Sequence, residues 1–144
     1  MATHSFMSCT ATLSGPGGEI DLGYGAGVAD EGITVSRAED ANGMQVGADG
    51  SVMHSLHAAR HGTVTVRLQK TSPTNAMLMT MYNYQRSSPA NWGQNNITVR
   101  DHARGDTTTC LVCAFKKVPD LSYAKDGNTH EWVFDVGQID TILG

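Results

Sequence analysis

Three clusters of residues in this sequence have types and spacings that binding or catalysis would use. The first is the glycine run Gly23, Gly25 and Gly27, which is typical of loops that hold dinucleotide phosphates. The full G-x-G-x-x-G spacing is missing, and the run leads into the acidic segment 29–32 rather than into a helix N-terminus that would bind an anion. We therefore predict a loop or tight turn without a cofactor.

The second cluster is Cys110 and Cys113, whose interval is common in metal sites. Residues three apart on a strand point to opposite faces, and no second pair completes a tetrahedral site, so we predict buried structural thiols. The third cluster is His54, His57 and His61. These histidines lie outside any H-E-x-x-H helix and have no carboxylate in register, so a zinc site is not expected.

Two pairs of neighbouring acids, Asp30 with Glu31 and Glu39 with Asp40, have the side chains that acid–base catalysis uses. Neighbours in an extended chain do not converge on one substrate atom, so we predict that both pairs face solvent. The sequence also has no G-x-S-x-G elbow, P-loop or Cys–His nucleophile context. We therefore do not expect an enzyme.

The elements that would position these residues are mainly strands. Four stretches alternate apolar and polar residues with period two, which indicates half-buried antiparallel strands. A fifth stretch is apolar on both faces, as in a central strand, and two weaker candidates precede them. In chain order the predicted strands are 5–13, 19–22, 33–36, 61–70, 97–100, 110–115 and 132–136.

One segment changes to helical spacing. Ser72 supplies an N-cap and Pro73 suits the first helical position, which predicts a helix over about 73–86. Its apolar face, which should pack on a sheet, is Met77, Leu78, Met81, Tyr82 and Gln85. The predicted fold is mainly β, a β-sandwich or barrel-like sheet of about seven to nine strands with one flanking α-helix.

Length and charge restrict the function further. The 144 residues suit a single domain, 1–144, with a net charge of −4. Segment 1–59 has seven acids and one base, so it carries −6, and segment 60–144 carries the remaining +2. Unlike patches of this kind favour head-to-tail attraction between copies. The nearest basic patch is Lys116 with Lys117, so tight DNA binding is not expected.

The cysteine count and the apolar runs bear on the compartment. Three cysteines, with no basic-then-apolar leader, favour a reducing compartment. No apolar run approaches the roughly 20 residues that span a bilayer, so we expect a soluble protein without membrane insertion.

The two tryptophans offer a different function. Trp92 lies in a polar loop, where it would be an interface anchor or would pack under its own loop. In a monomeric β-sandwich binding module, for carbohydrate for example, Trp92 or Trp132 would be a stacking platform. Trp132 alternates with Phe134, however, which predicts a place in the core.

Eight short segments, taken in order, resemble the small tail tube proteins of contractile-tailed, myovirus-type bacteriophages. The resemblance covers nearly the whole chain from about residue 18, and its specificity comes from the order of the segments rather than from any one of them. The segments are 29–33 (ADEGI), 46–50 (VGADG), 61–68 (HGTVTVRL), 71–75 (TSPTN), 92–95 (WGQN), 114–117 (AFKK), 131–135 (EWVFD) and 142–144 (ILG).

This resemblance implies a virion structural protein of the tail, assembled in the host cytoplasm. Six copies would close into a ring, and rings would stack helically into a hollow inner tube. The tube would enclose the tape measure protein, contact the sheath, tail terminator and baseplate hub proteins, and conduct DNA only in transit. A related secretion-system or contractile-injection tube subunit is the alternative within the same structural class.

The resemblance also implies where copies meet. Segment 42–60 is expected to be a long inter-ring loop, with contacts from segment 46–57. Segment 1–14 is expected to be either an N-terminal strand or an arm that orders on assembly. The expected subunit-interface residues are Val46, Asp49, Ser51, Met53, His57 and Trp92.

Overall fold

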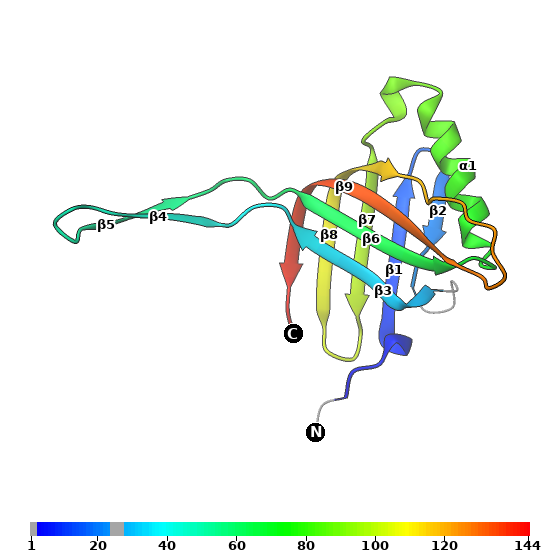
Figure 1. Cartoon of the computed structure of the whole chain (residues 1–144), viewed down its shortest axis with the longest axis horizontal. Coiled ribbons are helices and arrows are strands. Elements are labelled where there is room, and N and C mark those ends of the chain that lie inside the picture. The colour runs from blue at the N-terminus through cyan, green and yellow to red at the C-terminus, as the bar shows by residue number, and fades with distance from the viewer. Residues whose placement is uncertain (1–2, 24–27) are drawn as a thin grey trace.

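The computed structural model of the chain describes residues 3–23 and 28–144 (Figure 1). The predicted glycine loop around residues 24–27 lies outside this range, and so do the side chains of Asp30 and Glu31. The described strands are β1 (Cys9–Gly15), β2 (Gly18–Asp21), β3 (Val28–Arg37), β4 (Asn42–Val46), β5 (Val52–Leu56), β6 (Gly62–Gln69), β7 (Asn95–Asp101), β8 (Asp106–Lys117) and β9 (Thr129–Ile142). The helices are α1 (Thr74–Arg86) and two short 3-10 helices, η1 (Phe6–Ser8) and η2 (Pro89–Asn91).

Seven of the strands form one antiparallel sheet in the order β2-β1-β7-β8-β9-β6-β3. The sheet folds over on itself, so that β3 and β6 cross over β1 and β7 (Figure 1). Side chains from both halves meet in one hydrophobic cluster, which includes Leu13, Val66, Ile97, Trp132 and Phe134. The predicted mainly β fold with one flanking helix is confirmed, and every predicted strand overlaps an observed one.

Helix α1 begins within one residue of the predicted start. The Ser72 hydroxyl accepts a hydrogen bond from the Thr74 backbone N–H at 3.2 Å, but Pro73 rather than Ser72 occupies the N-cap position, one residue later than predicted. On the predicted apolar face, Leu78, Met81 and Gln85 are buried and Tyr82 is half-buried. Met77 was wrongly included, because it lies toward the edge of that face and 46% of it remains exposed.

A buried amide pair joins the end of α1 to the start of β7. The amides of Gln85 and Asn95 exchange two hydrogen bonds, of 2.7 and 2.9 Å, and Gln85 also donates to the Pro16 carbonyl at 2.9 Å. Both side chains are 0% exposed. A Cβ at Gly15 would overlap the Asn95 side chain, so the absence of a side chain there makes room for the pair. Buried amides cost free energy unless they are paired in this way.

Strand β8 carries an irregularity that the sequence analysis missed. Val112 has a φ of +56°, and the pairing with β7 shifts there, from Ile97 opposite Cys110 to Asn95 opposite Cys113. This β-bulge adds one residue, so Cys110 and Cys113 are both buried, at 0% exposure, rather than on opposite faces. The prediction of buried structural thiols is confirmed, although the geometry assumed for them was wrong.

A substitution at Val112 tests this bulge. A β-branched residue in the left-handed region is strained by roughly 1–2 kcal/mol, whereas asparagine tolerates that conformation. Because Val112 is 64% exposed, its replacement removes little apolar contact. We expect Val112→Asn to raise the free energy of unfolding by about 1 kcal/mol, measured by urea unfolding. Val52→Asn, at an exposed strand valine outside the bulge, is the control and should give no gain.

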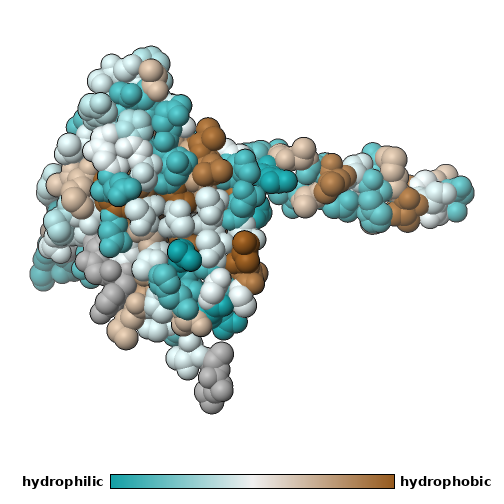
Figure 2. All heavy atoms as spheres, turned by 180° about the vertical axis from the view of Figure 1, so that it is seen from behind, coloured by the Kyte–Doolittle hydropathy of each residue, from teal (hydrophilic) through white to brown (hydrophobic). Residues whose placement is uncertain are grey.

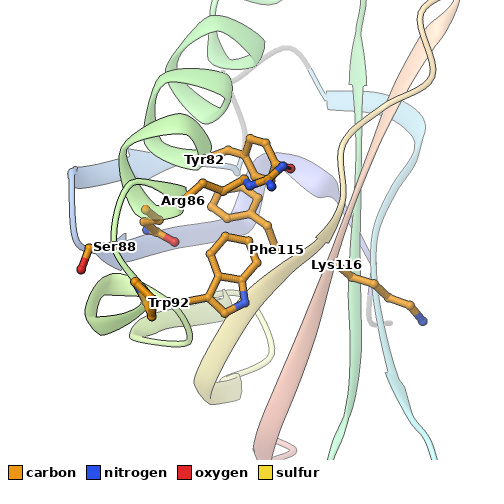
Figure 3. A pocket seen from close by; sticks show the side chains of 8 residues that line it. Tyr82, Arg86, Ser88, Trp92, Phe115 and Lys116 are labelled. Carbon is orange, nitrogen blue, oxygen red and sulfur yellow. Dashed lines mark hydrogen bonds between the residues drawn. The ribbon is translucent and has the colours of Figure 1, made fainter.

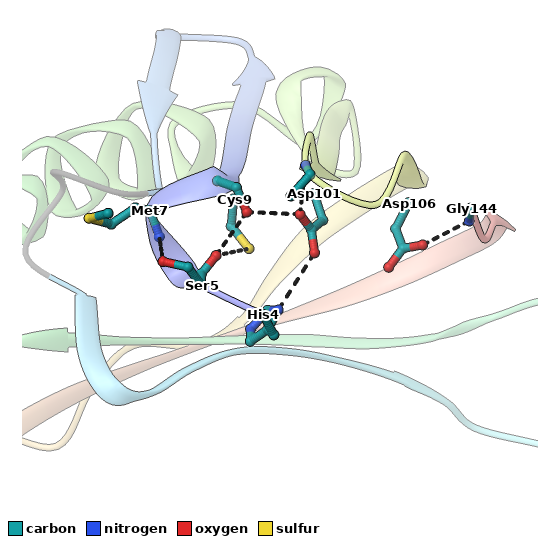
Figure 4. Close-up of polar contacts among 9 residues, drawn as sticks. His4, Ser5, Met7, Cys9, Asp101, Asp106 and Gly144 are labelled. Atoms are coloured by element: carbon teal, nitrogen blue, oxygen red, sulfur yellow. Dashed lines mark hydrogen bonds and ion pairs between the residues drawn. The ribbon is translucent and has the colours of Figure 1, made fainter. Parts of the chain in front are cut away.

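A carboxylate fastens the N-terminal segment to the turn between β7 and β8. Asp101 accepts hydrogen bonds from the Ser8 hydroxyl at 2.9 Å and the Ala103 backbone N–H at 3.1 Å (Figure 4). Its second oxygen lies 3.6 Å from His4 Nδ1. The Ser8 hydrogen bond is the main reason why the pKa of Asp101 lies below its ordinary value.

This depressed pKa predicts an acid-sensitive contact. A carboxylate with a lowered folded pKa stabilises the fold above its unfolded pKa of about 3.9, and the contribution is lost as pH falls through the folded pKa. We expect Ser8→Ala to raise the pKa of Asp101 and to move acid unfolding to higher pH, followed by NMR titration. Ser36→Ala, on β3, is the control. An unchanged Asp101 pKa would contradict the assignment.

Candidate functional site

The segment expected to be a long loop contains a β-hairpin that projects from the body of the protein (Figures 1 and 2). We call residues 42–56, comprising β4, β5 and the turn between them, the hairpin arm. Within residues 3–23 and 28–144, its two strands form a separate sheet in which each pairs with the other. These strands were not predicted from the sequence, because their apolar side chains have no core to pack against within one copy. The arm is a regular ribbon rather than an irregular loop.

The register of the arm divides its side chains between two faces. Cross-strand partners share a face, so Val46 lies beside Val52, and Met44 beside His54, on one side. Met53 lies on the other side, opposite Gln45. The two valines are 62% and 54% exposed, and apolar residues interrupt the polar surface of the arm in Figure 2. One face of the arm therefore presents an uncovered valine pair next to its tip.

The tip is a tight turn held by its own hydrogen bonds. The Gly47 N–H donates to the Ser51 carbonyl at 2.7 Å, and Gly50 has a φ of +88°. The Asp49 carboxylate accepts from the Ser51 backbone N–H at 3.0 Å, and this bond is the main cause of its lowered pKa. The turn therefore holds an ionised carboxylate at the end of the arm.

The base of the arm is polar. His57 Nδ1 lies 3.0 Å from the Asp40 carbonyl oxygen, and His61 Nε2 lies 4.0 Å from a Glu39 carboxylate oxygen. His54 is bonded instead to the Asn42 side chain at 3.2 Å. The three histidines thus have three different partners. Among residues 3–23 and 28–144 there is no group of three or more His, Cys, Asp or Glu side chains placed to hold a metal ion.

A second exposed feature surrounds Trp92, which is 37% exposed. We call it the aromatic pocket. It has a volume of about 540 Å³ and is lined by Tyr82, Gln85, Arg86, Ser88, Pro89, Trp92, Phe115 and Lys116 (Figure 3). The Tyr82 ring makes edge-to-face contacts with Trp92 at 6.1 Å and with Phe115 at 5.5 Å between centroids. These contacts hold the rings in place, and Trp92 still reaches solvent.

The charge in this pocket comes from Arg86. Its guanidinium donates to the Tyr82 hydroxyl at 3.0 Å and lies 5.7 Å from the centre of that ring. Lys116 points away from the rings in Figure 3, and its ammonium lies 4.0 Å from Asp135. The aromatic pocket therefore combines the rings of Tyr82, Trp92 and Phe115 with the guanidinium of Arg86.

The structure separates the predicted interface residues into groups. Val46, Asp49, Ser51 and Met53 lie on the hairpin arm, and His57 directly follows its second strand. Trp92 lies in the aromatic pocket, away from the arm. Position 52 lies within the predicted contact segment 46–57, but neither Val52 nor Arg86 was named among the expected interface residues. Pairing across the Asp49-Gly50 turn would have pointed to Val52, whereas no local pattern marks Arg86.

In the described part of the chain, no helix combines the length and apolar character needed to cross a bilayer.

Comparisons with known proteins agree on the class of protein. The sequence model of a family described as Bacteriophage PhiTE tail tube protein matches residues 1–144. A search of curated protein sequences found no match.

Solved structures share the fold at low sequence identity. The anti-feeding prophage cap, the tube terminating cap of that particle, has a TM-score of 0.60 and 8% identity, covering 100% of this chain and 93% of that chain. The sheath–tube complex of the PVC extracellular contractile injection system in its extended state gives 0.54 and 11%, covering 93% and 88%. The sheath/tube terminator of the same system gives 0.57 and 11%, covering 99% and 98%.

Proposed function

Because the chain belongs to the Bacteriophage PhiTE tail tube protein family and is a structural component of the virion tail, we propose that six copies close into a ring and that these rings stack into the inner tube of a contractile tail. The observation that carries this proposal is the family match over residues 1–144. The shared fold with tube and terminator components of contractile particles supports it.

The sheet itself supports ring closure. Among the described strands, β2 and β3 are the outermost, and each pairs with a neighbour on one side. Open sheet edges tend to aggregate. If β3 of one copy paired with the sheet of the neighbouring copy in a closed barrel, this edge would be covered. Strand β3 is ten residues long, which gives such an edge enough length for specific pairing.

The outward face of the sheet suits a wet channel. Thr12 pairs with Thr98, Thr98 with Thr109, and Thr34 with Thr65, which places uncharged hydroxyls side by side across strands. A charge of −4 per copy multiplied by six gives −24 per ring. A wall with this sign would let DNA pass with little adhesion. We propose that the lumen holds the tape measure protein and then conducts the genome.

We propose that the assembled tube contacts the sheath, tail terminator and baseplate hub proteins. We also propose assembly in the host cytoplasm and a structural role without catalysis. Structures that share this fold come from a sheath–tube complex and from a baseplate of other contractile particles. We also propose that stacking joins the acidic segment 1–59 of one copy to the more basic remainder of another, in which case high salt should loosen the rings.

We propose that the hairpin arm makes contacts between rings through Val46, Asp49, Ser51, Met53 and His57, and that Trp92 is part of the same interface. The projection of the arm and the exposure of its apolar side chains support this role. A chain that remained a monomer would leave this surface uncovered.

Negative-stain electron microscopy of the purified protein tests the proposal. We expect rings or long hollow tubes, and a strictly monomeric species at high concentration would contradict them. The monomeric binding module is less well supported, because Trp132 is only 1% exposed and donates its Nε1–H to Asn75 at 3.0 Å. Adjacent sheath and tape measure genes would separate a phage tail from a secretion-system tube.

A further inference from the structure

The valine pair on the hairpin arm requires a cover. A two-stranded hairpin is marginally stable alone in water, and Val46 and Val52 lie together on one face with more than half of each exposed. The aromatic pocket is the complementary feature. It has a volume of about 540 Å³, and Tyr82, Trp92 and Phe115 form part of its wall. Two short branched side chains would fit within it and cover the exposed part of Trp92.

The charges at the two sites are also complementary. Asp49 stands at the tip next to the valine pair, and Arg86 stands at the wall of the pocket. Within the described residues, neither Asp49 nor Arg86 forms an ion pair. A carboxylate and a guanidinium brought together at a partly dry interface form a charge-assisted hydrogen bond and fix the register of the contact.

The two sites cannot meet within one molecule. In Figure 1 the arm extends away from the sheet on one side, whereas α1 and the chain that follows it lie on the opposite side. An arm must therefore reach the pocket of another copy. Because the two contacting surfaces differ, this contact is heterologous, and repetition of a heterologous contact produces closed rings or open helical filaments.

We propose that the end of the hairpin arm of one copy docks into the aromatic pocket of a second copy, with Val46 and Val52 against Trp92 and Asp49 beside Arg86. This inference rests on the proposed tube function and specifies where the arm binds. Each copy then contributes one arm and one pocket. A segment of another tail protein is the competing occupant of the pocket.

Exchanging the charges of Asp49 and Arg86 tests the proposed contact, because neither side chain belongs to the hydrophobic core. We expect Asp49→Lys and Arg86→Glu each to raise the critical concentration for polymerisation about tenfold, equivalent to about 1.4 kcal/mol. The double variant should return to within about threefold of the wild type, because the pair is restored with reversed signs. Asp126→Lys, in the exposed segment before β9, is the charge control and should polymerise normally. Circular dichroism of each variant checks the fold.

Mixing the two single variants shows whether the contact joins different copies. The lysine-bearing arm of one variant matches the glutamate-bearing pocket of the other, and the unchanged arm matches the unchanged pocket. Equal amounts should therefore copolymerise near the wild-type critical concentration, although each variant alone does not. Val52→Asp changes the apolar part of the contact, which charge exchange cannot restore. Mixing it with Arg86→Glu should therefore not rescue polymerisation.

The outcomes separate this inference from the proposed function. If the wild type forms no rings or tubes, the proposed function fails and the docking fails with it. The wild type could instead form tubes while the effects of Asp49→Lys and Arg86→Glu add up in the double variant and the mixed single variants fail to copolymerise. That result would overturn only the docking. Normal tubes from Arg86→Glu that no longer bind sheath would assign the pocket to the sheath, and would also overturn it.

Discussion

Replacing Gln85 with leucine should lower the free energy of unfolding by about 3 kcal/mol. The substitution removes both hydrogen bonds to Asn95 and the one to the Pro16 carbonyl. Asn95 is then left 0% exposed without its partner amide, and an unsatisfied buried polar group costs roughly 1–3 kcal/mol. Urea unfolding would measure the change, provided that the slope of the free energy against urea concentration (the m-value) is the same in both proteins.

Two variants control this prediction. Gln45→Leu removes the same amide from the exposed hairpin arm and should change stability by less than about 0.5 kcal/mol. Changing Gln85 and Asn95 together to leucine should recover part of the loss, because no amide is then left unpaired. A single-variant loss below about 1 kcal/mol would show that water or another group satisfies Asn95.

Deletion of residues 49–53 should abolish tube polymerisation while leaving the subunit folded. The deletion removes the tip of the arm, one of its valines and the Asp49 carboxylate, and none of these residues belongs to the hydrophobic cluster. Sedimentation and negative-stain microscopy would measure assembly, and thermal melting followed by circular dichroism would measure the fold.

The matched control for the deletion is the removal of residues 125–127, which are also exposed and outside the core. This variant should still polymerise. Tubes that formed normally without residues 49–53 would rule out the arm as a stacking element. Loss of cooperative melting in the deletion variant would show instead that the arm supports the subunit fold.

The parts of the fold that follow local rules were predictable. Alternation in segment 61–70 predicts β6 because one face of that strand is buried, and Ser72 with Pro73 predicts the start of α1 because capping uses neighbouring residues. The bulge at Val112 was not predictable, since valine seldom adopts a positive φ and Cys110-Leu-Val-Cys113 has no turn residue.

The candidate site was predicted in part. The exposed arm residues could be named because a resemblance pointed to segment 42–60, yet the strands β4 and β5 were missed because their apolar face has no core within the same copy. The aromatic pocket combines side chains from α1, the segment around η2 and β8. Residues so far apart in sequence are brought together only by the tertiary fold.

The bulge in β8 bears on the reactivity of the two cysteines beside it. Because Val112 turns both neighbouring cysteines inward, burial raises the pKa of Cys110 to about 11 and that of Cys113 to about 12. Burial, and then the carboxylates of Asp101 and Asp106, also raise the pKa of Cys9. Thiols attack and oxidise as thiolates, so the sulfurs of Cys110 and Cys113 are slow to react near neutral pH. These two buried thiols therefore resist accidental disulfide cross-links between subunits.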